Sequence, residues 1–308
     1  MSSTVLPRTP GPVGLPDALR AASSAGRTLV MGVVNVTPDS FSDGGEFLDR
    51  DAAIAHGLAL VAEGADLVDV GGESTRPGAQ RVDEDEERRR VLPVVRALAA
   101  EGVVVSVDTM RAAIAADALE SGAVMVNDVS GGLADRDMAV VVGSAGSPYV
   151  VMHWRGHSAD MAERAVYADV VTEVVDELRG RLDALSAVGV DLDRVVIDPG
   201  LGFAKDAEHN WGLLARLDEV GVLGRPVLIG ASRKGFLGRL LADDAEVPRP
   251  ADEREAATTA ITALAAAAGV WAVRVHEAGP SRDAVAVVAA IRAPHHTWAG
   301  LERPPVPT

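Results

Sequence analysis

The sequence predicts an α/β fold of the (β/α)8 TIM-barrel type, and three observations carry this prediction. Eight short apolar runs alternate with Ala-, Leu- and Glu-rich stretches of helical period. The runs are apolar throughout, which suits parallel strands that are covered on both faces. The polar residues that end the runs lie about 34 residues apart on average, close to the length of one strand–helix unit. An open, doubly wound sheet is the alternative, but no G-x-G-x-x-G turn follows the first run.

The expected strands are short and rich in valine and isoleucine, which favour extended backbone. In chain order they are Thr28–Val36, Asp66–Val70, Val103–Val107, Val124–Val129, Tyr149–Met152, Arg194–Ile197, Pro226–Ile229 and Trp271–Val275. The clearest helical stretches between them are Ala52–Glu63, Glu84–Ala99, Val171–Val188 and Arg254–Ala268. Asp108 and Asp128, which end the third and fourth runs, are only 20 positions apart, so the helix between them must be short.

The barrel is expected over residues 27–293, between two segments of different composition. Residues 1–26 contain prolines and many Ser, Ala and Gly residues, which predicts a flexible leader. Residues 294–308 form a proline-rich tail. No linker interrupts the repeating pattern between these ends, so the sequence predicts a single barrel domain.

Composition excludes several classes of function. The chain has 308 residues and a net charge of −16, and so acidic a chain is a poor binder of nucleic acid or of an anionic membrane. The absence of cysteine excludes disulfides, thiolate metal sites and cysteine nucleophiles. The longest clean apolar run, Ala263–Val273, has 11 residues, whereas a spanning helix needs roughly 20. No signal peptide is recognisable, so a soluble cytoplasmic protein is expected.

In a barrel of this type, the loops that follow the strands build the functional site. Here these loops carry most of the unusual residues of the chain. The motifs are Asn35–Gly45, Asp69–Gly78, Asn127–Gly132, Asp198–Lys205, Ser232–Lys234 and Arg274–His276. The G-x-S-x-G, phosphate-loop and H-E-x-x-H motifs are absent, which disfavours a serine hydrolase, an NTPase and a zinc protease.

Three strand-end residues suggest a sub-site for a heterocycle. Asp108, Asn127 and Asp198 supply hydrogen-bond acceptors and one amide. Two carboxylate oxygens match a ring edge that bears adjacent N–H and NH2 groups, as in a guanine or a pterin. A buried carboxylate would also reject a ligand that lacks the amine.

A second sub-site is cationic. Arg274 and His276, with Arg76 as a further candidate, suit a phosphate or pyrophosphate group. The amide oxygen of Asn35 is a candidate ligand for Mg2+, a hard ion that keeps several waters and shares phosphate oxygens.

The six motifs, in this order, resemble those of dihydropteroate synthase of folate biosynthesis, in its bacterial single-domain form. The resemblance covers about residues 28–292. It implies a transferase that joins 6-hydroxymethyl-7,8-dihydropterin pyrophosphate to p-aminobenzoate, giving 7,8-dihydropteroate and pyrophosphate, with Mg2+ as cofactor. It also implies that sulfonamides bind as mimics of p-aminobenzoate.

The resemblance assigns residues to three sub-sites. It implies a pterin pocket made of Asp108, Asn127, Val129, Met152, Asp198, Lys234 and Arg274, with Arg274 stacked on the ring. It implies a pyrophosphate site made of Asn35, Arg76, Arg274 and His276, with magnesium at Asn35. It implies a p-aminobenzoate site made of Phe41, Thr75, Arg76, Pro77, Phe203 and Gly235. Gly235 departs from many relatives, which have a larger residue there.

The resemblance further implies a dissociative substitution. The C–O bond to pyrophosphate weakens first, Asp39 stabilises the cationic pterin methylene, and the nitrogen of p-aminobenzoate attacks. The residues expected to carry catalysis are Asp39, Lys234, Arg274 and His276. An anion clamp, a carboxylate beside the developing cation and the exclusion of water are together sufficient, so no covalent intermediate is needed.

Several of these residues also have purely structural interpretations. Asp108, Asp128 and Asp198 follow strands and could cap helices, an assignment preferred only for Asp128. His153 is expected to be a structural hydrogen-bonding residue rather than a catalytic one. Lys205 is expected to be a solvated loop lysine outside the site.

Two other functions remain open. A methyltransferase-type barrel that presents methyl-tetrahydrofolate to a corrinoid protein would share the Asp and Asn contacts, but would not need the Ser232–Lys234 and Arg274–His276 motifs. A non-catalytic paralogue would keep the pocket without the reaction, but no motif residue is missing. The Ala-rich stretch Ala256–Ala268 permits close helix packing, which predicts a homodimer.

Overall fold

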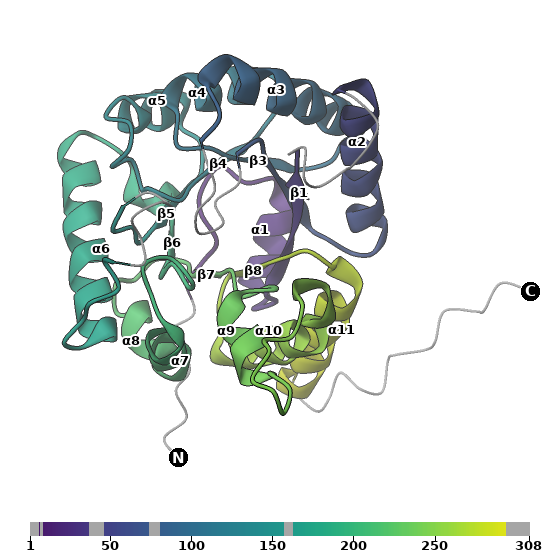
Figure 1. The fold of residues 1–308 in the computed structure, drawn as a ribbon. Helices are drawn as coiled ribbons and strands as arrows, with labels where there is room; N and C mark the ends of the chain where they lie inside the picture. The colour runs from purple at the N-terminus through teal and green to yellow at the C-terminus, as the bar shows by residue number, and fades with distance from the viewer. Residues whose placement is uncertain (1–5, 7–8, 37–45, 74–80, 157–162, 294–308) are drawn as a thin grey trace, which may run out of the picture.

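The structure is a computed structural model that describes residues 6, 9–36, 46–73, 81–156 and 163–293 (Figure 1). Eight strands alternate with helices in this part of the chain. The strands are β1 Leu29–Asn35, β2 Leu67–Gly71, β3 Val105–Asp108, β4 Met125–Asp128, β5 Tyr149–Met152, β6 Val195–Asp198, β7 Leu228–Ile229 and β8 Ala272–Val275. The expected strands match these within two residues at either end.

Apart from α1, which precedes β1, the helices follow the strands and form the outer ring of the molecule (Figure 1). They are α1 Asp17–Ser24, α2 Glu46–Ala62, α3 Glu84–Ala100, α4 Ala112–Glu120, α5 Met138–Ala145, α6 Val170–Ala187, α7 Ala207–Ala215, α8 Leu217–Gly221, α9 Gly235–Leu240, α10 Glu255–Ala268 and α11 Ala278–Arg292. Short 3-10 turns lie at Leu192–Arg194 and Ala251–Glu253. The first expected helix, Ala52–Glu63, begins six residues earlier than predicted, at Glu46. As expected, α4 between β3 and β4 is short, at nine residues.

All strand pairs are parallel, and the strand order is β6-β5-β4-β3-β2-β1-β8-β7. A parallel bridge between Ile197 of β6 and Val227, just before β7, joins the two ends of this sheet. A doubly wound sheet has open edges, whereas this sheet closes on itself. The predicted (β/α)8 barrel is therefore confirmed, and the doubly wound alternative is wrong.

The strands are buried on both faces, which explains their continuous apolar runs. One set of side chains fills the barrel interior and comprises Leu29, Met31, Leu67, Met125, Val150, Val196, Leu228 and Ala272. The alternate set packs beneath the helices and includes Val30, Val34, Val68, Val70, Val105, Val107 and Val151. Because successive side chains on a strand point to opposite faces, the two sets form two separate cores.

The N-terminal end of the barrel is covered by α1, which lies across the middle of the ring of strands in Figure 1. Leu15 and Leu19 are buried and join the interior cluster beside Trp271. Val13 N donates a hydrogen bond to the carbonyl oxygen of Asp193 at 2.9 Å. The sequence predicted a flexible leader over residues 1–26. The described part of this segment is instead docked, because its two leucines complete the interior core.

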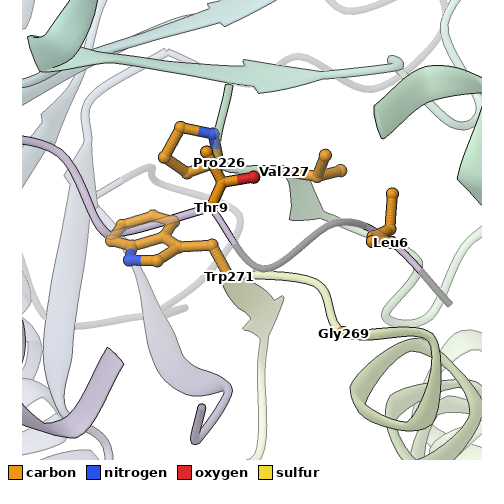
Figure 2. A pocket seen from close by; sticks show the side chains of 6 residues that line it. All are labelled: Leu6, Thr9, Pro226, Val227, Gly269 and Trp271. Atoms are coloured by element: carbon orange, nitrogen blue, oxygen red, sulfur yellow. The ribbon is translucent and has the colours of Figure 1, made fainter. Parts of the chain in front are cut away.

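A small cavity lies at the same end of the barrel (Figure 2). Its lining comes from the N-terminal segment and from the residues that precede β7 and β8, namely Leu6, Thr9, Pro226, Val227, Gly269 and Trp271. It is therefore remote from the strand ends that carry the predicted site. Within the described residues, no helix is long and apolar enough to cross a membrane.

We expect Leu19→Ala to lower the free energy of unfolding by about 2–4 kcal/mol, because it removes a buried side chain that closes the interior core. Urea denaturation followed by circular dichroism measures this change. Val140→Ala on α5 is the matched control, since Val140 is exposed. Equal stability of Leu19→Ala and Val140→Ala would show that α1 is not docked in solution.

Candidate active site

Strand register brings the polar residues of the site together at the C-terminal end of the barrel. Asp108 of β3 lies beside Gly71 of β2 and beside Asn127 of β4. Met152 of β5 lies beside Asp198 of β6. Because parallel strands end at the same rim, side chains from sequence positions far apart converge here.

An arginine links three of these strands. Arg274 Nε of β8 donates a hydrogen bond to Asp69 Oδ2 of β2 at 2.7 Å, and Arg274 Nη2 donates to Asp108 Oδ2 at 2.8 Å. Asn127 Nδ2 donates to the same Asp69 oxygen at 2.7 Å. This contact orients the amide, so the oxygen of Asn127 remains as an acceptor for a ligand N–H. The arrangement suits a planar ring edge with several donors.

Asp69 was not among the predicted site residues, although it carries both of these contacts. It is fully buried, and its second oxygen, Oδ1, has no hydrogen-bond partner in the structure. A sequence signal was present, since Asp69 is one of the polar residues near the end of an apolar run, as Asp108 is. Its role could not be read from that position, because it depends on the side chain of Arg274 some 200 positions away.

The second half of the ring is formed by Asp198 and Lys234. Asp198 Oδ1 accepts a hydrogen bond from Gly200 N at 2.7 Å, which fixes the carboxylate at the start of its loop. Lys234 Nζ donates to the carbonyl oxygen of Leu201 and lies 4.7 Å from the centroid of the Phe203 ring. Gly202 has φ of 76°, and a Cβ there would stand 2.9 Å from Lys234 Cδ. Glycine at 202 therefore allows the lysine to pass close to the loop.

Burial shifts the pKa values of this ring. Burial, with a smaller contribution from the charge of Asp69, raises the pKa of Asp108 to about 7 against the opposing charge of Arg274. Burial also raises the pKa of Asp198, which Lys234 opposes. Burial lowers the pKa of Lys234 to about 8, although Asp198 favours its charged form. Such perturbed groups in one place are typical of functional sites.

The candidate anion residues lie at the ends of β7 and β8. Ser232 Oγ lies 2.9 Å from His276 Nδ1 and accepts a hydrogen bond from His276 N at 3.2 Å. Arg274 lies two residues away on the same strand. The pair suits an anionic oxygen.

The remaining predicted residues fall into two groups. Val129 and Met152 are buried near the ring, Asn35 ends β1 partly exposed, and Gly235 begins α9 with open space around its Cα. Outside the described residues lie Asp39, Phe41, Thr75, Arg76 and Pro77. No group of three or more His, Asp or Glu side chains suitable for a metal ion occurs among the residues that are described.

Two structural interpretations need correction. Asp128 does not cap a helix, because its oxygens accept from Ser130 N at 2.8 Å and from Gly132 N and Tyr149 Oη at 2.7 and 2.8 Å. It closes the loop after β4 instead. Lys205 is not solvated: its side chain is buried, and its Nζ lies 2.9 Å from His153 Nδ1.

The interpretation of His153 as a hydrogen-bonding residue agrees with the structure. Its Nε2 lies 2.9 Å from Glu177 Oε2, and its Nδ1 meets Lys205. The capping alternatives for Asp108 and Asp198 are excluded, because α4 begins after Arg111 and α7 is capped by Asp206.

Comparison with known proteins identifies the family. The family model described as "Pterin binding enzyme" matches residues 31–276, which includes every motif at the strand ends. The chain belongs to the pterin-binding enzyme family. Among members of this family, the dihydropteroate synthase of Mycobacterium leprae is 57% identical over 262 residues, covering 85% of this chain and 92% of that protein.

Solved structures of the pterin-binding enzyme family agree with the fold. Xanthomonas albilineans dihydropteroate synthase with 4-aminobenzoic acid is 42% identical, with a TM-score of 0.81 over 87% of this chain and 94% of the other. Yersinia pestis dihydropteroate synthase in a sulfonamide drug complex is 38% identical, with a TM-score of 0.80 over 87% and 95% of the two chains. The relatives are single-barrel transferases of folate synthesis, in agreement with the resemblance drawn from the motifs.

Asp69→Ala should lower the free energy of unfolding by about 2–3 kcal/mol, because it leaves the buried Arg274 guanidinium with one carboxylate in place of two. The double variant Asp69→Ala/Arg274→Met should recover part of the lost free energy of unfolding, because the guanidinium that Asp69→Ala leaves with fewer partners is then removed as well. Denaturant titration of the two single variants and the double variant measures the coupling free energy between Asp69 and Arg274. Strict additivity of the two changes would show that the contact does not stabilise the barrel.

Proposed function

We propose that this protein condenses 6-hydroxymethyl-7,8-dihydropterin pyrophosphate with p-aminobenzoate, giving 7,8-dihydropteroate and pyrophosphate. The observation that carries this proposal is the buried ring at the barrel rim. It comprises Asp69, Asp108, Asn127, Asp198, Lys234 and Arg274. The relatives named above carry the same activity in their names.

The ring explains how the pterin is recognised. The carboxylates of Asp108 and Asp198 and the amide oxygen of Asn127 accept hydrogen bonds from the N–H and NH2 groups of the heterocycle. Lys234 donates to its ring oxygen or nitrogen acceptors, and Val129 and Met152 supply apolar walls. A ligand without the amine leaves buried carboxylates unpaired, which excludes it.

The second part of the proposed mechanism is the stabilisation of the leaving group, pyrophosphate. Arg274 and His276, together with Arg76, stabilise the charge that develops on pyrophosphate as the C–O bond breaks. Asn35 fits Mg2+, because a single amide oxygen at a strand end suits an ion whose other ligands are waters and phosphate oxygens. When bound, magnesium neutralises negative charge on the pyrophosphate.

The substitution then proceeds at the pterin methylene carbon. The electron pair of the C–O bond leaves with pyrophosphate, and Asp39 stabilises the carbon cation that results. The amine nitrogen of p-aminobenzoate forms the new C–N bond and releases one proton. Phe203 and Gly235, with Phe41, Thr75 and Pro77, hold the aminobenzoate so that its nitrogen is aligned.

Purified protein should release pyrophosphate from the pterin pyrophosphate only when p-aminobenzoate and magnesium are both present. A coupled pyrophosphate assay measures the release, and chelation with EDTA should abolish it. A sulfonamide should inhibit competitively with p-aminobenzoate. Pterin binding without release would instead identify a non-catalytic paralogue or a methyl-carrier barrel, and would refute the proposal.

Binding of a pterin that lacks the pyrophosphate should strengthen as the pH rises through about 7. The pKa of Asp108 is about 7 in the free protein. Below that pH the carboxyl is protonated and loses its capacity as a double acceptor, and above it the carboxylate accepts fully. Calorimetry between pH 5.5 and 8.5 measures the affinity, and Asp108→Asn is the control. The same pH dependence in Asp108→Asn would assign the effect to another group.

We also propose that the protein forms a homodimer through α10 and α11. These helices pack together, and Leu264 and Ile291 are 70% and 74% exposed on them. Leu264→Glu should convert the dimer to a monomer in light scattering. Val188→Glu, at an exposed position at the end of α6, should leave it unchanged. A wild-type monomer would refute this proposal.

A further inference from the structure

The loop that carries Phe203 has an unfavourable backbone. Gly200, Gly202 and Ala204 have φ values of 71°, 76° and 46°, so three alternate residues are left-handed. Glycine adopts this conformation readily, whereas alanine does not. A loop of this kind keeps its shape only where contacts from outside hold it.

Lysine side chains supply two of those contacts. Lys234 Nζ donates to the carbonyl oxygen of Leu201, and Lys205 Nζ donates to the carbonyl oxygen of Phe203 at 3.1 Å. The two amines thus hold the loop on either side of Gly202. These are the only lysines among the 29 Lys and Arg residues of the chain; Lys205 is buried and Lys234 is partly buried.

Lys205 is connected to the far side of the barrel wall by a chain of hydrogen bonds. Glu177 Oε2 on α6 can only accept, so the His153 Nε2 that lies 2.9 Å away carries the proton. His153 Nδ1 is then an acceptor, and Lys205 Nζ donates to it at 2.9 Å. Burial and the charge of Lys205 lower the pKa of His153 to about 4, which keeps the imidazole neutral. The chain therefore has one direction, from Lys205 through His153 to Glu177.

Charged groups from four elements act on Lys205. Burial, together with the charges of Lys234 and Arg155, lowers its pKa to about 7. Asp198 and Glu177 raise it. The charge of Glu177, whose carboxylate contacts His153, thus favours the charged form of Lys205, by less than the charge of Asp198 does.

We propose that Lys205 is a positioning residue for the synthase reaction, holding the Phe203 loop in its reactive shape under control of the Glu177–His153 chain. This inference rests on the proposed function, because Phe203 matters as a wall of the p-aminobenzoate site. Lys205 does not touch the reacting atoms. Loss of its donor frees the Phe203 carbonyl and lets the loop relax away from Lys234.

Lys205→Met should raise the KM for p-aminobenzoate by about 10- to 100-fold, with a smaller change in kcat, since misplacement of a positioning group by about 1 Å has effects of this size. Tyr167→Phe is the matched control. Tyr167 Oη donates to the carbonyl oxygen of Ala204 at 3.0 Å, so the variant removes a different contact to the same loop. Equal increases in KM for Lys205→Met and Tyr167→Phe would show that Lys205 has only a structural role, and would overturn the proposal.

A second pair of variants leaves the loop intact. Glu177→Gln removes the charge at the end of the chain, whereas Glu173→Gln removes a carboxylate that contacts Arg155 at 2.8 Å but not His153. In protein labelled with 13C at the lysine ε-carbons, only two lysine signals appear. Glu177→Gln should lower the pKa of Lys205 in this titration and raise the KM for p-aminobenzoate at pH 7, and Glu173→Gln should do neither. Indistinguishable behaviour of the two variants would overturn the proposal.

A failure of the proposed function can be distinguished from a failure of the proposed role of Lys205. If the wild-type protein released no pyrophosphate in the presence of p-aminobenzoate, the proposed function would fall. The lysine titration uses no substrate, so it decides the Glu177–His153–Lys205 connection in either case.

Discussion

The rim of this barrel depends on the pairing of buried charges. The carboxylates of Asp69, Asp108 and Asp198 are buried, and the positive charges beside them come from the partly exposed side chains of Arg274, which is paired with Asp69 and Asp108, and Lys234, which favours the charged form of Asp198. An isolated buried charge costs several kcal/mol, so each of these groups requires its counter-charge. The two contacts of Arg274 hold β2, β3 and β8 in one arrangement at the rim.

The two ends of the barrel use different physics. At the N-terminal end, α1 and the alternating strand side chains bury apolar surface, which supplies stability without directional contacts. At the C-terminal end, short strands stop at glycines and polar residues whose hydrogen bonds are directional. The free energy gained by apolar burial at the N-terminal end offsets the cost of the rim, where Asp69 Oδ1 is buried without a hydrogen-bond partner.

The barrel could be predicted from the sequence because strand–helix repetition and apolar runs are local signals. The position of Asp108, Asn127 and Asp198 at the strand ends could be predicted for the same reason. The role of Asp69 and the burial of Lys205 were missed, because each depends on a partner from a distant strand or loop, Arg274 or His153. The docking of α1 was not predicted, because Leu15 and Leu19 stand in a segment rich in proline and alanine. These two leucines become buried only against the assembled N-terminal end of the barrel.

The contacts of Arg274 explain why an arginine rather than a lysine stands among the polar side chains at the barrel rim. Its guanidinium is planar and is held by two carboxylates through Nε and Nη2, so its plane is fixed before any ligand arrives. A fixed plane offers a face for stacking on a heterocycle and a remaining N–H edge for an anion. Lysine would satisfy the charge of Asp69 or Asp108 but would leave the other carboxylate without a partner and offer no plane. The contacts that stabilise the rim therefore also fix the plane and the free N–H edge of Arg274, which is the arrangement that the proposed binding of a heterocycle beside an anion requires.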